Sequence, residues 1–560
     1  MNKTAAFIFV LFFYCLNAFP QVENVPLSNK VYDFLKLMSV KKIIPSINDD
    51  DPNLSRRDVA DFLSQIDSKT IELSNTEKKL LNKYKIEFVP GERNRENTSV
   101  MFDGKGKFLK RFGEIFTKKK KYLYALDKEN NNLYVEGLGN LYISQEIKPN
   151  KKHTASLMDV GIRARGTLFN HLGYNISVLK GAVIGSKDLA VTTEPNIKTT
   201  FHIAALTEDI NSYDFANGYV RYHTEPMENM DLSVQLGREQ LKYGLGYNDR
   251  LALSGNNPNM DFIKFKFKYG VINYSSITAS TVGEFKQIRN DRYTKYFAAN
   301  RLKLSFPDVL DFGIGESVIY SSRGIELAYL NPLVFYKFVE MSLQDRDNAT
   351  VFFDVQTHFL KNLEFQGTFF LDENILFNLS ELDQYINKTA YQIGAYVYEP
   401  ANIENLSFIL EYTRIRPYVY THFDPKNTYT AFGVILGHEI GPNADQLYTK
   451  LAYNFSEWVS LSMEYQKIRK GNNIVDANGN LIRNVGGDVF QVHREGIDSD
   501  EAIFLDGERV NTDYVLIKLS VEPIRDFIFD FNYVYRIDNN ISNGFKTDFS
   551  YAFLRMNIEY

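Results

Sequence analysis

The C-terminal stretch, residues 527–560, contains two runs in which apolar and polar side chains alternate. A period of two places successive side chains on opposite faces of a strand, so each run predicts a strand with one apolar face. Such a strand at the end of a chain leaves an open edge in a soluble sheet, whereas a closed barrel pairs it with the first strand. The sequence therefore favours a barrel over an amphipathic strand of a soluble β-protein. The apolar positions are Phe527, Phe529, Phe531, Tyr533, Tyr535, Ala552, Leu554, Met556, Ile558 and Tyr560.

Residues 1–18 are predicted to be a secretory signal peptide. Lys3 precedes the apolar run 5–16, and Ala18 supplies a small residue at a plausible cleavage point. The run is too short to anchor the chain across a bilayer. Cys15 is the only cysteine, and Tyr14 stands where a lipoprotein signal needs a small residue. The mature chain is thus expected to hold neither a disulfide nor a thiolate metal site.

The composition restricts the class of protein further. The chain has 64 Lys and Arg against 69 Asp and Glu, a net charge of −5, which gives no reason to expect a nucleic-acid partner. Aromatic residues make up 14% of the chain, and no run after the signal is long and apolar enough for a membrane helix. Tyr and Phe favour strands and form the girdles of transmembrane barrels. A membrane protein of this composition must therefore be a barrel.

Residues 19–90 differ from the rest, because their apolar residues recur at helical spacing. Ser55 with Asp58, and Ser74 with Glu77, predict the starts of two helices, and a third helix precedes them. The stretches VYDFLKLMSVKKIIP and LSRRDVADFLSQI resemble the helix pair of surface-layer-homology modules, which implies peptidoglycan or another cell-wall polymer as a partner. The favoured interpretation is a small α-helical plug or periplasmic domain below the barrel. Residues 91–131 are expected to be a polar linker.

Residues 132–560 predict an all-β transmembrane barrel of about 18 antiparallel strands. Strand assignment stays ambiguous at 199–240 and 416–445. Connections near Gly270, Asp308, Lys361 and Pro523 are short, whereas 321–348 and 468–513 are long, as expected for periplasmic turns and external loops. We expect a monomer in outer-membrane lipid. Within 321–348, Asn331 is predicted to cap a helix that folds over the mouth of the barrel.

Four blocks resemble the capsule-assembly Wzi family. They are LGREQLKYGLGYNDRLALS (236–254), ESVIYSSRGIELAYLNPLVFYKFVE (316–340), RIRPYVYTHF (414–423) and LGHEIGPNADQLY (436–448). The resemblance implies an eighteen-stranded outer-membrane barrel with a helical bundle at its periplasmic end. It also implies a lectin-like role in which exported capsular polysaccharide is held at the cell surface. The helical region of this sequence is longer than that of the family.

Candidate saccharide ligands are arginines and aromatic or polar residues near strand ends, because Arg grips carboxylates bidentately and planar groups suit sugar rings. Arg163 and Arg165 share the strand face opposite Ile162, which should be the lumen. Leu236 and Arg238 have the same parity, so either Gly237 marks a bulge or Arg238 lies beyond the bilayer. For each residue the alternative is an ion pair that stiffens the barrel. The remaining candidates are Glu239, Tyr243, Glu316, Arg323, Arg414, Arg416, Tyr418 and His438.

Enzyme motifs are absent from the sequence. His438-Glu439 lacks the second His of a zinc-protease helix, no Gly-x-Ser-x-Gly elbow occurs, and the histidines show no metal-ligand spacing. We therefore expect no cofactor, no metal and no enzymatic activity. The predicted function is an outer-membrane barrel that binds surface or capsular polysaccharide and takes part in capsule or envelope assembly. The alternatives are a transport channel, a barrel enzyme, and a scaffold of a surface secretion or gliding machine.

Overall fold

The computed structural model describes residues 21–560 except 95, 103–112, 129, 150–151, 201–210 and 373–382. The predicted signal peptide lies outside these residues. The first elements are the helices α2 (Val31–Val40), α3 (Arg56–Asp67) and α4 (Asn75–Phe88). The predicted capping boxes are confirmed, since Ser55 caps α3 with Asp58 and Ser74 caps α4 with Glu77. No helix among the described residues is long and apolar enough to span a membrane.

The polar stretch after the helices contains short strands. β1 (Thr98–Val100) and β2 (Lys120–Tyr122) form a parallel pair, and β3 (Tyr124–Lys128) runs antiparallel to the first residues of β4. Short 3-10 helices, η1 (Thr70–Glu72) and η2 (Pro90–Glu92), precede them.

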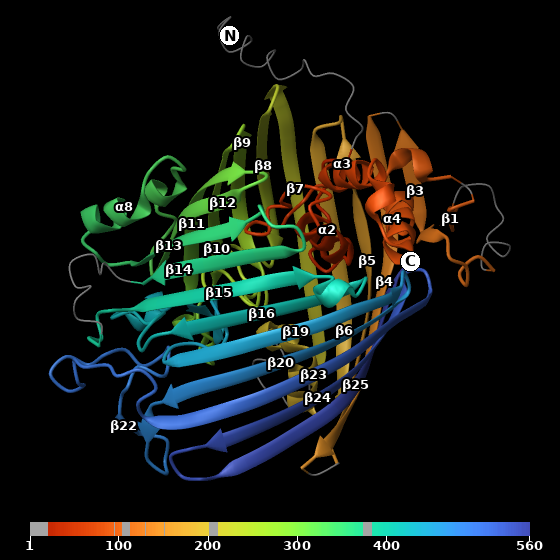
Figure 1. Cartoon of the computed structure of the whole chain (residues 1–560). Helices are drawn as coiled ribbons and strands as arrows, with labels where there is room; N and C mark the ends of the chain where they lie inside the picture. The colour runs from red at the N-terminus through yellow and green to blue at the C-terminus, as the bar shows by residue number, and fades with distance from the viewer. Residues whose placement is uncertain are drawn as a thin grey trace, which may run out of the picture.

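Eighteen antiparallel strands then close into a barrel, which confirms the predicted fold class and strand number (Figure 1). They are β4 (Asn131–Lys148), β5 (Thr154–Leu168), β6 (Leu172–Gly185), β7 (Ser212–Met227), β8 (Met230–Glu239), β9 (Met260–Tyr269), β10 (Ile272–Val282), β11 (Thr294–Phe306), β12 (Leu310–Ser321), β13 (Asn348–Thr357), β14 (Leu363–Leu371), β15 (Thr389–Tyr398), β16 (Leu406–Ile415), β19 (Ala444–Ser456), β20 (Val459–Asn472), β23 (Glu508–Ile524), β24 (Phe527–Asn540) and β25 (Lys546–Glu559).

The barrel closes through its first and last strands. β25 pairs antiparallel with β4, from Ser550 opposite Lys148 to Glu559 opposite Leu138. Beyond the strand, the Tyr560 amide donates to the Gly137 carbonyl at 2.8 Å and the Gly137 amide donates back at 2.6 Å. The terminal strand therefore has the partner that its pattern requires.

The strand faces separate by polarity. On β20, Leu461 and Met463 point outward and are exposed, while Ser462 and Glu464 face the lumen. An apolar outer face on a closed antiparallel barrel is the architecture that crosses a membrane, because all backbone groups of the wall are paired within it.

The helices occupy the end of the barrel that carries the short turns (Figure 1). The Asn362 amide in one such turn donates to the Val40 carbonyl at 2.9 Å, and Ser46 donates to Asp311 at 3.0 Å near another. The apolar faces of α2, α3 and α4 share one core with lumen-facing residues of β15, β16 and β19, among them Tyr396 and Tyr448. The helical bundle thus plugs this end of the barrel.

An acidic triplet, Asp49, Asp50 and Asp51, carries the plug into the lumen. Asp50 pairs with Arg301 and with Lys303, the latter at 2.7 Å, and Asp51 pairs with Lys264. Burial alone would raise the pKa of Asp50, but Arg301 and Lys303 outweigh it and hold this pKa well below its usual range. The triplet therefore fixes the plug to β9 and β11 through buried charges.

Two further segments, the lumenal loops 240–259 and 416–443, fill the lumen on the far side of the plug. The second carries a small hairpin, β17 (Thr430–Ala431) and β18 (Val434–Ile435). Their apolar residues pack with lumen-facing residues of β9 to β15. The Gly244 amide donates to the Asp50 carbonyl at 2.9 Å, so the first loop rests on the plug. The loop core includes Leu241, Tyr243, Leu251, Leu253, Val419, Tyr420, Tyr429, Leu436 and Ile440.

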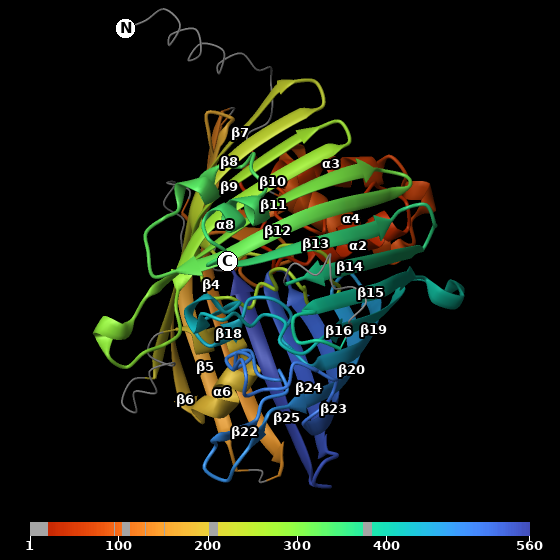
Figure 2. The same ribbon diagram turned by 90° about the vertical axis from the view of Figure 1, so that its left-hand side faces the viewer.

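The outer-wall segment, residues 322–347, does not cover the mouth, so that prediction is wrong. Its helix α8 (Tyr336–Ser342), which follows η5 (Leu327–Leu330), lies outside the barrel wall (Figures 1 and 2). Val318 and Tyr320 pack against this segment, whereas Ile319 between them belongs to the lumenal core. The helix also begins later than predicted, because Asn331 accepts the Leu333 amide in a turn instead of capping the helix.

We predict that Asp50→Ala loosens the plug. The change removes the carboxylate that pairs with Arg301 and Lys303, and both cations stay buried. The free energy of docking the plug should fall by about 3 to 5 kcal/mol. Limited proteolysis of residues 25–90 in the folded barrel should accelerate. Asp67→Ala, which removes a half-exposed partner of Lys85, should change the rate little. Equal rates for Asp50→Ala and the wild type would contradict anchoring by the triplet.

Candidate functional site

A cavity of about 610 Å³ lies in the lumen between the plug and one part of the wall. Its floor comes from α2, α4 and Asp49, and its wall comes from β16, β19, β20 and β23 to β25. The first lumenal loop contributes Tyr247 and Arg250. The cavity is therefore enclosed on one side by elements from the amino end and on the other by the last strands.

Aromatic and charged side chains line this cavity together. The aromatic residues are Tyr32, Phe34, Tyr84, Tyr142, Tyr247, Tyr396, Trp458 and Phe553. Such rings offer apolar faces with polar edges, and Arg and carboxylates offer planar hydrogen-bonding groups. The charged residues are Lys30, Asp33, Lys36, Asp49, Lys83, Glu194, Lys242, Arg250, Lys450, Glu457, Glu464, Lys518, Glu522, Asp530 and Arg555.

Most charges in the cavity wall are paired across neighbouring strands. Lys450 of β19 lies 3.0 Å from Glu464 of β20, and Lys518 of β23 lies 3.2 Å from Asp530 of β24. Arg555 of β25 stands over the ring of Tyr142 at 5.4 Å, and its buried Nε has no hydrogen-bond partner among the described residues. A buried donor without a partner is costly, so Arg555 is a side chain that can bind a ligand. Arg250, Trp458 and Asp530 of the same cavity also carry a buried polar atom without a hydrogen-bond partner among the described residues.

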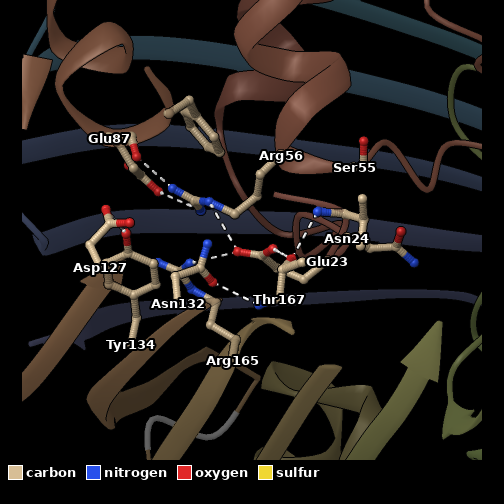
Figure 3. A network of polar contacts seen from close by, with 12 residues as sticks. Glu23, Asn24, Ser55, Arg56, Glu87, Asp127, Asn132, Tyr134, Arg165 and Thr167 are labelled. Atoms are coloured by element: carbon tan, nitrogen blue, oxygen red, sulfur yellow. Dashed lines mark hydrogen bonds and ion pairs between the residues drawn. The ribbon is translucent and has the colours of Figure 1, made fainter. Parts of the chain in front are cut away.

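Arg165 faces the lumen, as its parity predicts, but holds the amino-terminal segment in place (Figure 3). Its guanidinium donates to Glu136 at 2.7 Å and lies 3.4 Å from Glu23. Thr167 donates to Glu23 at 2.7 Å and accepts from the Val22 amide at 2.9 Å. These contacts join residues 22 and 23 to β5.

Arg163 and the plug arginine Arg56 complete this network. Arg163 lies 3.4 Å from Glu136 and 3.5 Å from Glu559. Arg56 donates to the Glu87 carbonyl at 2.6 Å, and Figure 3 shows these two residues. Both arginines are paired inside the protein. The geometry thus corresponds to the ion-pair alternative for Arg163 and Arg165.

Tyr243 and Tyr418 lie in the lumenal loops, as do the candidates Arg416 and His438. Tyr243 is buried and its hydroxyl contacts the Ser275 hydroxyl at 2.6 Å. Tyr418 is buried with φ +63°, and its amide donates to the Gly486 carbonyl at 3.0 Å. Tyr243 belongs to the lumenal core, whereas Tyr418 contacts the loop that contains Gly486, and neither lines the cavity.

His438 is buried beside Asp249, with 3.8 Å between Nδ1 and the carboxylate. Burial lowers the pKa of His438 to about 4, although Glu439 opposes the shift. Burial also raises the pKa of Asp249 to about 6, although the amides of Glu439 and Arg250 donate to it and act in the other direction. His438 is therefore neutral at pH 7.

Arg238 and Arg414 face away from the lumen. Arg238 is exposed and pairs with Asp261 at 2.8 Å on the outer face. The β7–β8 pairing is unbroken at Gly237, so there is no bulge there and Arg238 lies at the outer end of β8. Arg414 stacks on Phe504 at 3.8 Å.

The remaining candidates lie in separate places. Glu239 faces the lumen and accepts from Gln235 at 3.4 Å, and Arg416 lies 3.5 Å from Asp383. Glu316 and Arg323 belong to the outer wall and the segment that covers it. The predicted residues thus do not converge, and none of them lines the cavity that the described residues form.

Among the described residues, one group of side chains has metal-ligating atoms close together. The ligand atoms of His223, Glu225 and Asp231 lie within 4.8 Å of one another across the β7–β8 hairpin. Arg57 already pairs with Glu225 at 2.8 Å, which places a positive charge where a cation would bind. The group therefore fits an ion pair better than a metal ion.

Comparison with known proteins identifies the family. The sequence model of the capsule assembly protein Wzi family matches residues 125–497, which is more than half of the chain. The chain belongs to this family. The structure is similar to that of Wzi from Escherichia coli, described as an outer membrane, carbohydrate-binding β-barrel involved in group 1 capsule assembly. The two share 12% identity over 96% of this chain and 99% of that one, with a TM-score of 0.56.

Other solved barrels are more distant from this member of the Wzi family. OprD of Pseudomonas aeruginosa covers 76% of the chain at 9% identity with a TM-score of 0.41, and OccAB2 of Acinetobacter baumannii covers 76% at 11% with a TM-score of 0.44. Similarities of this size support no inference. No curated protein sequence matches the chain.

The cavity residues of this Wzi-family barrel left a partial signal in the sequence. Asp530, Asn532 and Arg555 stand on the polar faces of the last two strands, which their alternation marks as lumen-facing. Tyr32 and Lys36 come from a helix, and Tyr247 comes from a loop without periodicity. Only the fold brings these three groups together.

We predict that His438 destabilises the Wzi-family barrel in acid. Its folded pKa lies below the unfolded value near 6.5, so stability is lost as pH falls from about 6.5 towards 4. A shift from 6.5 to about 4 corresponds to about 3 kcal/mol. The difference in unfolding free energy between wild type and His438→Gln, measured from pH 7 to pH 4, should change by this amount in favour of the variant. A pH-independent difference would refute the assignment.

Proposed function

We propose that this protein lies in the outer membrane, binds a surface or capsular polysaccharide there and takes part in capsule or envelope assembly. Its membership of the Wzi family supports the role, and the similar Escherichia coli barrel is described as carbohydrate-binding. The observation that carries the proposal is the aromatic and charged cavity between the plug and the barrel wall. Its volume falls within the range of about 300–1,000 Å³ typical of ligand pockets.

The cavity has the chemistry that sugar recognition needs. Tyr142, Tyr247 and Tyr396 offer ring faces for the apolar faces of pyranoses, and polar groups such as Gln366 and Asn532 suit hydroxyls. Arg555, with its unpaired Nε, suits a carboxylate on an acidic sugar. We infer that a saccharide segment of the polymer binds here.

The alternative of a transport channel requires an open lumen. The plug contacts the wall at one end, and the two lumenal loops form an apolar core with the wall beyond it. These segments favour a closed barrel that binds a ligand over an open channel.

The helical plug buries much of its apolar surface in the barrel. Any contact of the plug with peptidoglycan would therefore have to be made by the surface that faces away from the barrel.

The binding proposal is tested by retention of capsular polysaccharide from the host on the refolded barrel. We expect Arg555→Ala to weaken retention of an acidic polymer about tenfold or more, since a charge-assisted hydrogen bond contributes about 1.5 to 3 kcal/mol. Arg469→Ala is the matched control, because Arg469 pairs with Asp445 outside the cavity. Equal retention by wild type and Arg555→Ala would exclude Arg555 from binding, and no retention by the wild type would refute the proposed function.

The closed lumen makes a second prediction, on ion conductance. In a planar bilayer the wild-type barrel should pass little current, because the plug and the lumenal loops fill its cross-section. A variant that lacks residues 241–258 should conduct more, since it loses part of the lumenal core. Steady, large single-channel currents through the wild type would favour the transport channel instead.

A further inference from the structure

The outer-wall segment, residues 322–347, covers a part of the barrel exterior that is unusually polar. On β10, Ile277 and Ala279 face the lumenal core, so Tyr274, Ser276, Thr278 and Ser280 face outward. A bilayer-facing strand normally carries apolar side chains at these positions. Ser276 is buried although it faces outward, which shows that the segment shields this face.

Hydrogen bonds attach the segment to this polar wall. Tyr274 donates to the Pro332 carbonyl, Thr278 donates to the Tyr329 carbonyl at 3.1 Å, and Asn300 of β11 donates to the Val334 carbonyl at 3.1 Å. Three backbone carbonyls of an irregular stretch are thereby satisfied by side chains of the wall. Irregular backbone is tolerated at membrane depth only when protein groups satisfy it in this way.

Glu316 of β12 holds the start of α8. Its carboxylate accepts the amides of Tyr336 at 2.7 Å and Lys337 at 3.3 Å, and it is almost fully buried under the segment. The predicted ligand residue Glu316 therefore satisfies the free N–H groups at the start of the helix. Arg323 likewise binds Asp347 through two hydrogen bonds, at 2.8 and 2.5 Å, and joins the two ends of the segment.

The other face of the segment is apolar and points away from the protein. Leu333 is 89% exposed, Leu327 76% and Phe338 70%, and Ile325 and Met341 are more than half exposed. Exposure of so many large apolar side chains on one segment to water is unfavourable in free energy. The segment thus makes polar contacts with the barrel wall and presents apolar side chains to its surroundings. A loop in water is expected to have the reverse arrangement.

This apolar face continues the outer surface of the neighbouring strands. Ile263 of β9, Leu302 of β11 and Phe312 of β12 point outward and are exposed. Tyr274, which contacts Pro332, is the third residue of β10, next to the short turn at Gly270. The segment thus extends from the outer strand ends towards the turn end, across the apolar belt. The exposed charges Asp345 and Arg346 stand beside the start of β13, at the outer rim.

We propose that the outer-wall segment is an integral part of the membrane-facing surface, with acyl chains of the surrounding bilayer packed against Leu327, Leu333 and Phe338. The segment covers the polar outer face of β10 and presents an apolar surface to the bilayer in its place. The inference is independent of saccharide binding, because the segment and the lumenal cavity lie on opposite sides of the wall.

Single nitroxide labels test this proposal. The only cysteine, Cys15, lies in the predicted signal, so Leu333→Cys and Phe338→Cys give singly labelled mature barrels. Met463→Cys, on the outer face of β20, is the membrane control. Ile497→Cys, 72% exposed in the long loop between β22 (Leu481–Arg483) and β23, is the matched aqueous control. Each full mature barrel is refolded, checked by heat-modifiable migration in a gel, and placed in phosphatidylcholine vesicles.

Collisions of the label with oxygen, which concentrates in acyl chains, are compared with collisions with a water-soluble nickel chelate. We expect labels at 333 and 338 to match position 463, with an oxygen-to-nickel ratio at least about tenfold above that at 497. Ratios like that at 497 would place the segment in water and overturn the proposal. Low accessibility to both reagents would mean that a protein or a second copy covers the face, which also overturns it. Because the two labelled positions are independent, failure of one variant to fold leaves the other as a test.

Discussion

Backbone hydrogen bonding without solvent is the constraint on which this structure depends. A bilayer core offers no partner for an N–H or a carbonyl, so a sheet that crosses it must close on itself. Here the closure lies between β25 and β4, strands that are separated by most of the chain. The long last strand, with its apolar outer face, is stable only because β4 supplies its second edge. Plug, lumenal loops and cavity all require the lumen that this pairing encloses.

The lumen is filled by two kinds of interaction. On the plug side charged contacts, such as the pairs of Asp50 with Arg301 and of Asp51 with Lys264, add to the apolar core that the helices share with the wall. On the far side they are apolar, because the loop residues Leu253 and Tyr429 pack against Phe297 and Phe352 of the wall. Buried charges tolerate little displacement, so they fix the position of the plug, while the apolar core contributes most of the burial energy. The cavity is the space beside β19 to β25 that neither kind of contact fills.

The sequence allowed the fold to be predicted wherever a regular period existed. The alternation in β24 and β25, the capping boxes at Ser55 and Ser74, and the short turns between strands follow from local rules. Loops 240–259 and 416–443 have no period, and their apolar residues such as Leu251 and Leu436 look like strand residues until the lumen is known. This is why strand assignment was ambiguous at 416–445.

The candidate site was harder to predict, because its chemistry comes from distant segments. Arg165 was placed in the lumen from its parity, but its partner Glu23 could not be inferred, because it lies 142 residues earlier in the chain. Glu316 was predicted to bind the ligand. Its carboxylate instead accepts the amide at the start of α8, which lies outside the barrel wall. Arg555 stood on a recognised polar face, but that its Nε lacks a partner became visible only in the fold.

The contacts of the plug have a consequence for the order of folding. Lys30 donates to Ser520, 490 residues later in the chain, and Arg525 donates to the Lys83 carbonyl across 442 residues. The helices are made first, but these partners exist only after β23 has been synthesised. Contacts of such sequence separation form slowly, because the entropy of closing the intervening chain is lost before they are gained. Locking of the plug and sealing of the wall therefore belong to the same late step of folding.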